Sequence, residues 1–419
     1  MRFRWLVGFL TVAAPFSLSA QVTAIKAGTL VDPETGAAAR NQVILVENGR
    51  ITAVGAAVGI AANATVIDLS DATVLPGLFD AHTHLCMTVN LQRDAGRYYY
   101  TTLNDPDSYR SIQGVANARS MLAAGFTTVR DVGNEGNYAC TSLRRAIDAG
   151  LVEGPTIINA GRIIAPYGGQ FQLQQDKKGV LAEPEYYFAD TRDELLKAVR
   201  ENIQYGATVI KLVVDDQRYI YSPEDIRFAV DEAARAGLKV AAHVWTGPGA
   251  HNAALAGVAS LEHLNGISDE DLALAKRNGV TAVFTPFPEW VLKQFRGEER
   301  GHKEYLQEID RLRSGYRTGI TVAFGTDAIH DLPGYTRGSL SIRWIDSYLE
   351  AGFTPKALLQ AMTINAARLL GVDQDRGAIR PGRAADIIAV PGNPLDDPRV
   401  LRQVQFVMKN GKVVKGAGK

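Results

Sequence analysis

The sequence predicts an α/β protein, a (β/α)8 TIM barrel with a small β-sandwich domain built from both chain ends. Between residues 76 and 374, apolar strand-like runs alternate with helical patterns, as parallel strands and outer helices do in such a barrel. Both ends of the chain instead show short β-branched runs separated by turn residues. A doubly wound open sheet is the competing arrangement. The sequence has no G-x-G-x-x-G turn after a strand, which weakens the dinucleotide-binding form of that alternative.

The first twenty residues are typical of a secretory signal peptide. Arg2 and Arg4 give a basic start, residues 5–16 form an apolar run, and residues 17–20 supply the small residues of a cleavage site. The run is short for a bilayer span, which needs about 20 apolar residues, and no later segment reaches that length. We therefore expect cleavage near Ser19 or Ala20 and export to the periplasm or the medium, rather than a membrane anchor or a buried helix.

Residues 21–75 and 375–419 have the turn and strand pattern of one β-domain. Asn48-Gly49 and Asn410-Gly411 are strong signals for two-residue hairpin turns. Because the two segments share one pattern, we expect closure of the intervening residues to bring them together. The expected strands are residues 23–27, 42–47, 51–54, 65–69, 385–390, 404–409 and 412–414.

Residues 76–374 supply the eight strands of the predicted barrel. The expected strands are residues 74–84, 127–132, 156–160, 208–214, 239–244, 260–264, 281–285 and 321–326. The intervening helices include residues 192–205, 223–236, 269–278 and 303–318. Thr191, Ser222 and Ser268 occupy N-cap positions, and glycines such as Gly237 follow the helix ends.

The overall composition describes an ordinary folded protein. The 419 residues are 46% hydrophobic and 21% charged, which argues against disorder. The 45 basic and 45 acidic residues give no net charge, so nucleic acid is not an expected partner. The two cysteines exclude a disulfide scaffold and a Cys-rich zinc module. Cys86 and Cys140 either pair in an oxidising compartment or remain thiols.

Six polar residues fall at or near the carboxyl ends of five predicted strands. A lone histidine on a strand is usually a packed core residue, and an Asp after Gly-Thr is usually a helix cap. Six such residues at the carboxyl ends of the strands of one barrel instead indicate a functional site, because this end is the catalytic face of the fold. Imidazoles and a carboxylate suit zinc or a similar divalent ion, and a lysine inside an apolar strand needs a reason. The residues are His82, His84, Lys211, His243, His263 and Asp327.

The order of these residues resembles that of the amidohydrolase superfamily. Residues 75–84 and 377–386 are similar to the motifs that flank the barrel in that superfamily, while residues 127–131 and 260–263 resemble its imidazolonepropionase-like branch. That branch includes metal-dependent dipeptidases of the prolidase-like and Xaa-Arg types and ochratoxin-hydrolysing amidases. The resemblance extends over nearly all of the mature chain, and the metal motif is its most specific part.

The resemblance implies a site with two divalent metal ions, expected to be Zn²⁺. His82, His84 and Asp327 would hold one ion, and His243 and His263 the other. Lys211, carboxylated by CO₂, would bridge both. An activated water would attack an amide carbonyl, with Asp327 as the catalytic group that shuttles the proton.

Three βα loops depart from the motifs of the branch. They are residues 165–170, 215–219 and 244–247, and such loops set specificity in a barrel. Substrate identity therefore does not transfer from relatives. Candidate substrate-binding residues are Tyr167, Gln170, Arg218, Tyr219, Tyr221, Trp245 and His330, with ordinary loop packing as the plainer alternative.

We expect the substrate to be a small molecule, a dipeptide or an N-acyl amino acid, hydrolysed at its C–N bond. A lactonase, a cyclic-amide hydrolase or a deaminase on the same metals is the alternative enzyme. A non-catalytic scaffold is the alternative of a different class, and such proteins typically lose metal ligands. Analogy with relatives also implies a homo-oligomer.

Overall fold

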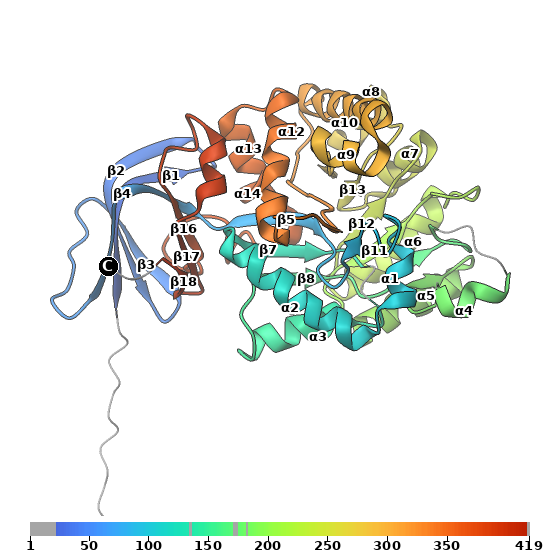
Figure 1. The fold of residues 1–419 in the computed structure, drawn as a ribbon, viewed down its shortest axis with the longest axis horizontal. Helices are drawn as coiled ribbons and strands as arrows, with labels where there is room; N and C mark the ends of the chain where they lie inside the picture. The colour runs from blue at the N-terminus through green and yellow to red at the C-terminus, as the bar shows by residue number, and fades with distance from the viewer. Residues whose placement is uncertain (1–21, 134–135, 171–174, 182, 417–419) are drawn as a thin grey trace, which may run out of the picture.

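The computed structural model describes residues 22–133, 136–170, 175–181 and 183–416, so the predicted signal peptide lies outside the described residues. A β-domain and a larger α/β body lie side by side, as the sequence predicts (Figure 1). No helix of the described part is long and apolar enough to cross a membrane.

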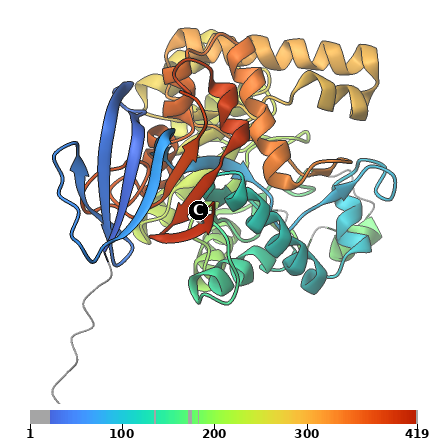
Figure 2. The same cartoon turned by 60° about the vertical axis from the view of Figure 1, so that its left-hand side comes forward.

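The β-domain is a seven-stranded sheet with strands from both chain ends. Its order is β18-β17-β16-β4-β1-β2-β3, in which only β1 and β4 are parallel among neighbouring pairs. The sheet folds over a core that includes Ile25, Val74, Ile387 and Phe406. Figure 2 shows the N-terminal and C-terminal strands against one another. The strands are β1 (Thr23–Asp32), β2 (Ala37–Glu47), β3 (Arg50–Gly55), β4 (Thr65–Pro76), β16 (Ile387–Val390), β17 (Phe406–Lys409) and β18 (Lys412–Lys415).

The two predicted hairpin turns have the backbone that their residues favour. Asn48 and Gly49 have φ of 50° and 77°, and Asn410 and Gly411 have φ of 48° and 77°. Left-handed φ at both central positions is the signature of a type I′ turn, whose twist matches that of the flanking strands. The turns also contact one another, since a Cβ on Gly49 would lie 2.7 Å from the Asn410 carbonyl oxygen. This contact joins the two ends of the chain.

The larger body is a ring of parallel strands. Neighbouring strands pair in parallel from β5 through β7 to β8, and again from β11 through β12 and β13 to β14. Backbone bonds from Thr208 and Val209 to the Asn159 carbonyl join the two groups. The strands are β5 (Leu78–Thr83), β7 (Phe126–Asp131), β8 (Thr156–Asn159), β11 (Ile210–Val213), β12 (Val240–His243), β13 (Ser260–Glu262) and β14 (Thr281–Val283), with the short additions β6 (Val89–Asn90), β9 (Ile163–Ala165), β10 (Tyr186–Phe188) and β15 (His330–Asp331).

The eighth expected strand, residues 321–326, closes the ring without forming a regular ladder. It makes one bridge, between Ala282 and Val322, and the Ala81 amide donates to the Phe324 carbonyl at 2.8 Å. Gly325 lets this segment pack closely against β14 and β5, because a Cβ there would lie 2.4 Å from the Val283 side chain and 2.9 Å from the His82 Cβ. The sequence predicted the position of this segment correctly but not its irregular backbone.

Helices cover the outside of the ring, and α5, α6 and α8 begin at the expected caps. Thr191, Ser222 and Ser268 each accept a hydrogen bond from the backbone amide three residues on. The helices are α1 (Tyr99–Asn104), α2 (Asp107–Ala123), α3 (Ala139–Asp148), α4 (Lys178–Leu181), α5 (Arg192–Gln204), α6 (Pro223–Arg235), α7 (Gly247–Ala256), α8 (Asp269–Arg277), α9 (Glu289–Arg296), α10 (Glu298–Thr318), α11 (Arg337–Ser341), α12 (Ile345–Glu350), α13 (Pro355–Ala361) and α14 (Ile364–Leu370).

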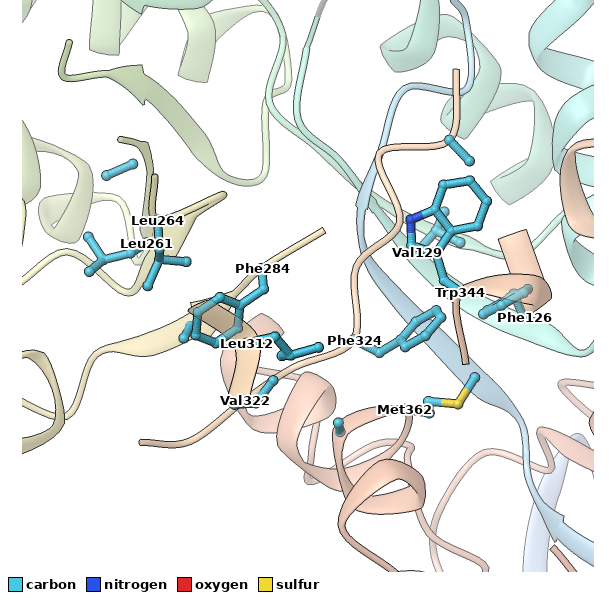
Figure 3. Packing of buried hydrophobic residues seen from close by; sticks show 14 of the residues in the cluster. Phe126, Val129, Leu261, Leu264, Phe284, Leu312, Val322, Phe324, Trp344 and Met362 are labelled. Carbon is cyan, nitrogen blue, oxygen red and sulfur yellow. The ribbon is translucent and has the colours of Figure 1, made fainter. Parts of the chain in front are cut away.

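The main apolar core lies between the ring and these helices. Figure 3 shows Phe324 beside Trp344 and Met362, with Phe126 close by. The rings of Phe126 and Phe324 lie 6.1 Å apart and nearly parallel, and all four side chains are fully buried. Because burial of a large apolar side chain contributes roughly 1.5–3 kcal/mol, this core fixes the strands whose ends carry the polar residues.

Candidate metal centre

The ends of the ring strands bring the six predicted metal-site residues into one cavity. His82 lies on β5, with His84 just beyond it, Lys211 lies on β11, and His243 ends β12. His263 directly follows β13, and Asp327 follows the irregular eighth segment. All six line one cavity of about 580 Å³. The structure therefore brings together residues that lie up to 245 positions apart in the sequence, 327 less 82.

Three of the six form a compact group. The Nε2 atom of His84 lies 3.2 Å from an Asp327 oxygen, and Nε2 of His82 lies 3.9 Å from the same oxygen. Together these residues offer donor atoms that all lie within 4.8 Å of one another, close enough to share one ion. Divalent zinc takes imidazole nitrogen and carboxylate oxygen at about 2.0–2.2 Å, so small movements suffice for ligation.

The other two histidines continue the group. The His263 ring lies 4.7 Å from the His82 ring and 4.7 Å from the His243 ring. Trp245 stacks on His243 with the ring planes 6° apart and centroids 5.7 Å apart. The histidines thus form a continuous cluster, and an indole covers one end of it.

The electrostatics of the cluster favour the neutral imidazole at three of its four histidines. Burial lowers the pKa of His82, His243 and His263 well below the usual value, and the nearby Lys211 lowers the pKa of all three further. Burial also disfavours the charged form of His84, but the Asp327 carboxylate outweighs this effect and raises the pKa of His84. A neutral imidazole has the free lone pair that a metal ligand needs.

Buried polar atoms without partners show that the cluster fits a metal. Among the described residues, no hydrogen-bond partner reaches His82 Nε2, His243 Nε2 or Lys211 Nζ. Orphaned buried polar atoms are rare in native proteins, and a bound ion is one kind of group that satisfies them. Burial lowers the pKa of Lys211 to about 8, so a larger fraction of this lysine is neutral near physiological pH than of an exposed lysine. A neutral amine is the form that can add CO₂.

The backbone at the site is strained. His263 and Asp327 have φ of 68° and 53°, in the left-handed region that non-glycine residues seldom adopt. Asp80 helps to hold the backbone beside Asp327. Its carboxylate accepts hydrogen bonds from the preceding residue, from the Thr326 amide at 3.1 Å and the Thr326 hydroxyl at 2.7 Å. Strain of this kind, held by the surroundings, is common at functional sites.

The predicted substrate-binding residues divide into two groups. Gln170, Trp245 and His330 line the cavity. Tyr167, Arg218 and Tyr219 are exposed and do not line this cavity. Tyr221 is buried, and its hydroxyl donates to the Ala189 carbonyl, so this side chain packs under the loop instead.

The cavity is also lined by residues that were not predicted from the sequence. Asp216 lies 3.6 Å from His243 Nε2 and accepts a 3.2 Å bond from the Gln170 amide group. Glu308 and Arg311 from α10 line the far side of the cavity. Nothing in the helical pattern of α10 marks these two, because an exposed helix face carries the same residue types.

Glu308 gives the fold a testable pH dependence. Burial raises the pKa of this carboxyl from 4.5 to about 8, although the charge of Arg311 opposes the shift. A raised pKa means that the folded state holds the proton more tightly. The resulting stability is therefore fully present below pH 4.5 and is lost as the pH rises through about 8.

We expect Glu308→Gln, which is neutral at every pH, to remove this loss. Between pH 4.5 and pH 8, the free energy of unfolding of the wild type should fall by about 2 kcal/mol more than that of the variant. This value is smaller than the full pKa shift implies, because solvent screens the partly exposed Glu308. Urea unfolding at both ends of the range measures the difference. Parallel pH profiles for the two proteins would contradict the expectation.

Comparison with known proteins assigns the fold and the site to a family. The amidohydrolase family model matches residues 73–415. The chain belongs to the amidohydrolase family. Membership supports metal-dependent hydrolysis of carbon–nitrogen bonds.

Individual relatives place the chain in the imidazolonepropionase-like branch. It is 28% identical to ochratoxinase from Aspergillus niger, over 95% of this chain and 88% of the relative. It is 25% identical to imidazolonepropionase from a Geobacillus species, over 90% of this chain and 91% of the relative. A crystal structure of a Xaa-Pro dipeptidase with bound methionine superposes with a TM-score of 0.83 at 28% identity, over 94% of this chain and 100% of that one. These similarities confirm the predicted branch and fold class.

Proposed function

We propose that this amidohydrolase cleaves the amide bond of a dipeptide or an N-acyl amino acid, with two divalent metal ions bound in the candidate metal centre. The observation that carries the proposal is the convergence, in one cavity, of three buried polar atoms on His82, His243 and Lys211 for which the described part of the chain supplies no hydrogen bond. Similarity to an ochratoxinase and to a Xaa-Pro dipeptidase supports an amide substrate.

In this proposal all six residues bind metal, and Asp327 also moves a proton. His82, His84 and Asp327 would hold the first ion, His243 and His263 would hold the second, and carboxylated Lys211 would be a ligand to both. When bound, the ions, expected to be Zn²⁺, supply Lewis acidity to the scissile carbonyl and lower the pKa of water. Asp327 accepts the proton of the attacking water and delivers it to the leaving nitrogen. The new C–O bond replaces the C–N bond, and the products are a carboxylic acid and an amine.

A substrate panel with product identification tests the reaction. We expect hydrolysis of some dipeptides or N-acyl amino acids, with release of a free amino acid detected by mass spectrometry. The panel includes a lactone, a cyclic amide and an aromatic amine as the alternatives. Turnover of one of these with no amide cleavage would contradict the proposal, and so would a panel without any turnover.

We also propose that the protein is exported, because residues 1–20 have the pattern of a signal peptide. Cys86 and Cys140 are thiols in the structure, buried with their sulfur atoms 2.6 Å apart, and an oxidising compartment would allow them to pair. We expect the protein recovered from a periplasmic fraction to begin near Gln21 and to show no titratable thiol after unfolding. Recovery of the uncleaved chain from the cytoplasm with two thiols would contradict this.

Self-association is a further proposal that rests on analogy with relatives. Light scattering of the purified protein would test it, and a monomeric mass across the working concentration range would contradict it.

A further inference from the structure

A buried ion pair crosses the interior of the ring behind the first metal motif. Arg130 on β7 and Glu262 on β13 are 1% and 0% exposed, and an Arg130 Nη2–Glu262 Oε1 distance of 2.6 Å joins them. These strands are not neighbours in the ring. β7 pairs with β5 and β8, whereas β13 pairs with β12 and β14. Burial of two charges costs several kcal/mol per ion, so the pair is weak evidence for stability alone and calls for another role.

The second oxygen of Glu262 contacts a candidate metal ligand. Glu262 Oε2 lies 2.7 Å from His82 Nδ1. A carboxylate only accepts, so His82 carries its proton on Nδ1 and directs the lone pair of Nε2 into the cavity. His84 Nδ1 instead faces the Gly133 carbonyl at 2.6 Å, and His263 Nδ1 faces the Thr285 hydroxyl at 2.9 Å. Among these three contacts, only that of His82 is made to a charged group.

The remaining donors of Arg130 fix this arrangement. Its Nε donates to the Ala81 carbonyl at 2.6 Å, directly before His82, and its Nη1 donates to the Ser260 hydroxyl at 2.9 Å. The Ser260 hydroxyl in turn donates to Glu262 Oε1. Arg130 therefore holds both the backbone of the motif and the carboxylate that contacts its first histidine.

We propose that Glu262, held by Arg130, is a positioning residue for the metal ion bound by His82. Its carboxylate selects the tautomer of His82, orients the ring and makes Nε2 a stronger donor to the ion. Groups that support metal ligands in this way typically change metal affinity by about 10–100-fold when they are replaced. The inference rests on the proposed function, in which His82 binds a divalent ion.

Calorimetric titration of the metal-free protein with Co²⁺ tests the proposal. Glu262→Gln keeps the shape of the side chain and removes its charge. We expect one of the two bound ions to lose about 10–100-fold in affinity, with a change in the visible Co²⁺ spectrum. A merely structural role would leave both readouts unchanged.

Glu185→Gln is the matched control. Glu185 is also buried in an ion pair, with Arg110, and it accepts bonds from the Gly136 amide at 3.1 Å and the Thr102 hydroxyl at 2.9 Å. It lies outside the cavity lining, so this variant should lose stability while keeping the affinity for both ions.

A milder variant keeps the test valid if Glu262→Gln fails to fold. Ser260→Ala removes one bond to Glu262, and we expect a smaller loss of affinity for the same ion. Unchanged affinity in both the Ser260 and Glu262 variants would overturn the inference and leave the proposed function intact. A wild type that binds no Co²⁺ would overturn the proposed function, and the inference with it.

Discussion

Asp327→Asn is expected to lower kcat/KM for amide hydrolysis by about 10³-fold while the protein stays folded. The side-chain amide of asparagine cannot accept the proton of the attacking water. Proton transfer by a well-placed side chain contributes roughly 10²–10⁴-fold to a reaction rate. Asparagine also suits this position structurally, since φ is 53° and asparagine tolerates left-handed backbone better than alanine. Steady-state kinetics on a cleaved dipeptide, with thermal unfolding of the same samples, measure both effects.

Asp331→Asn is the control for this prediction. Asp331 lies four residues further on, is exposed, and does not line the cavity of the metal centre. Its replacement should leave kcat/KM within about twofold of the wild type, as surface changes usually do. If the Asp327 variant kept near-wild-type kcat/KM, the proton-shuttle role of Asp327 would be wrong.

Lys211→Ala is expected to abolish hydrolysis with only a small loss of stability. The wild-type ammonium is buried without a hydrogen-bond partner among the described residues, so its removal relieves a desolvation cost that partly offsets the cavity created. Activity should fall by about 10³-fold or more, because the bridging ligand is lost. If the working group is a carboxylate on Lys211, a short carboxylic acid such as propionate should restore part of the rate to the variant.

Lys409 provides a matched control for a buried lysine. Burial lowers the pKa of Lys409 to about 8, as it does for Lys211, but Lys409 Nζ donates to both oxygens of Asp386, at 3.1 and 2.9 Å. Lys409→Ala should therefore lower the free energy of unfolding and leave kcat/KM unchanged. An active Lys211 variant, or one that propionate does not rescue, would contradict the carboxylated-lysine role.

The fold was predictable because local signals agree with the global arrangement. The N-caps at Thr191, Ser222 and Ser268 mark helix starts, and the two Asn-Gly turns mark hairpins at both chain ends. The eighth segment shows the limit of this reasoning. Its place follows from the repeating pattern, whereas its single bridge and the tight packing at Gly325 depend on the neighbouring strands, which the sequence pattern does not show.

The residues proposed to bind metal were selected by position, and their supporting groups were missed. Arg130 and Glu262, like Lys211, are charged residues inside strands. Their pairing across the ring is invisible in the sequence, because it depends on which strands face each other. The directions of loop side chains were harder to predict. Tyr221, for example, turns inward and donates to the Ala189 carbonyl, because tertiary packing sets its position.

The metal content of active protein tests the central claim most directly. Purified protein should contain two divalent ions per chain by elemental analysis, chelation should remove them together with amide hydrolysis, and two equivalents of Zn²⁺ should restore both. Full hydrolytic activity in protein with no detectable divalent ion would contradict the account.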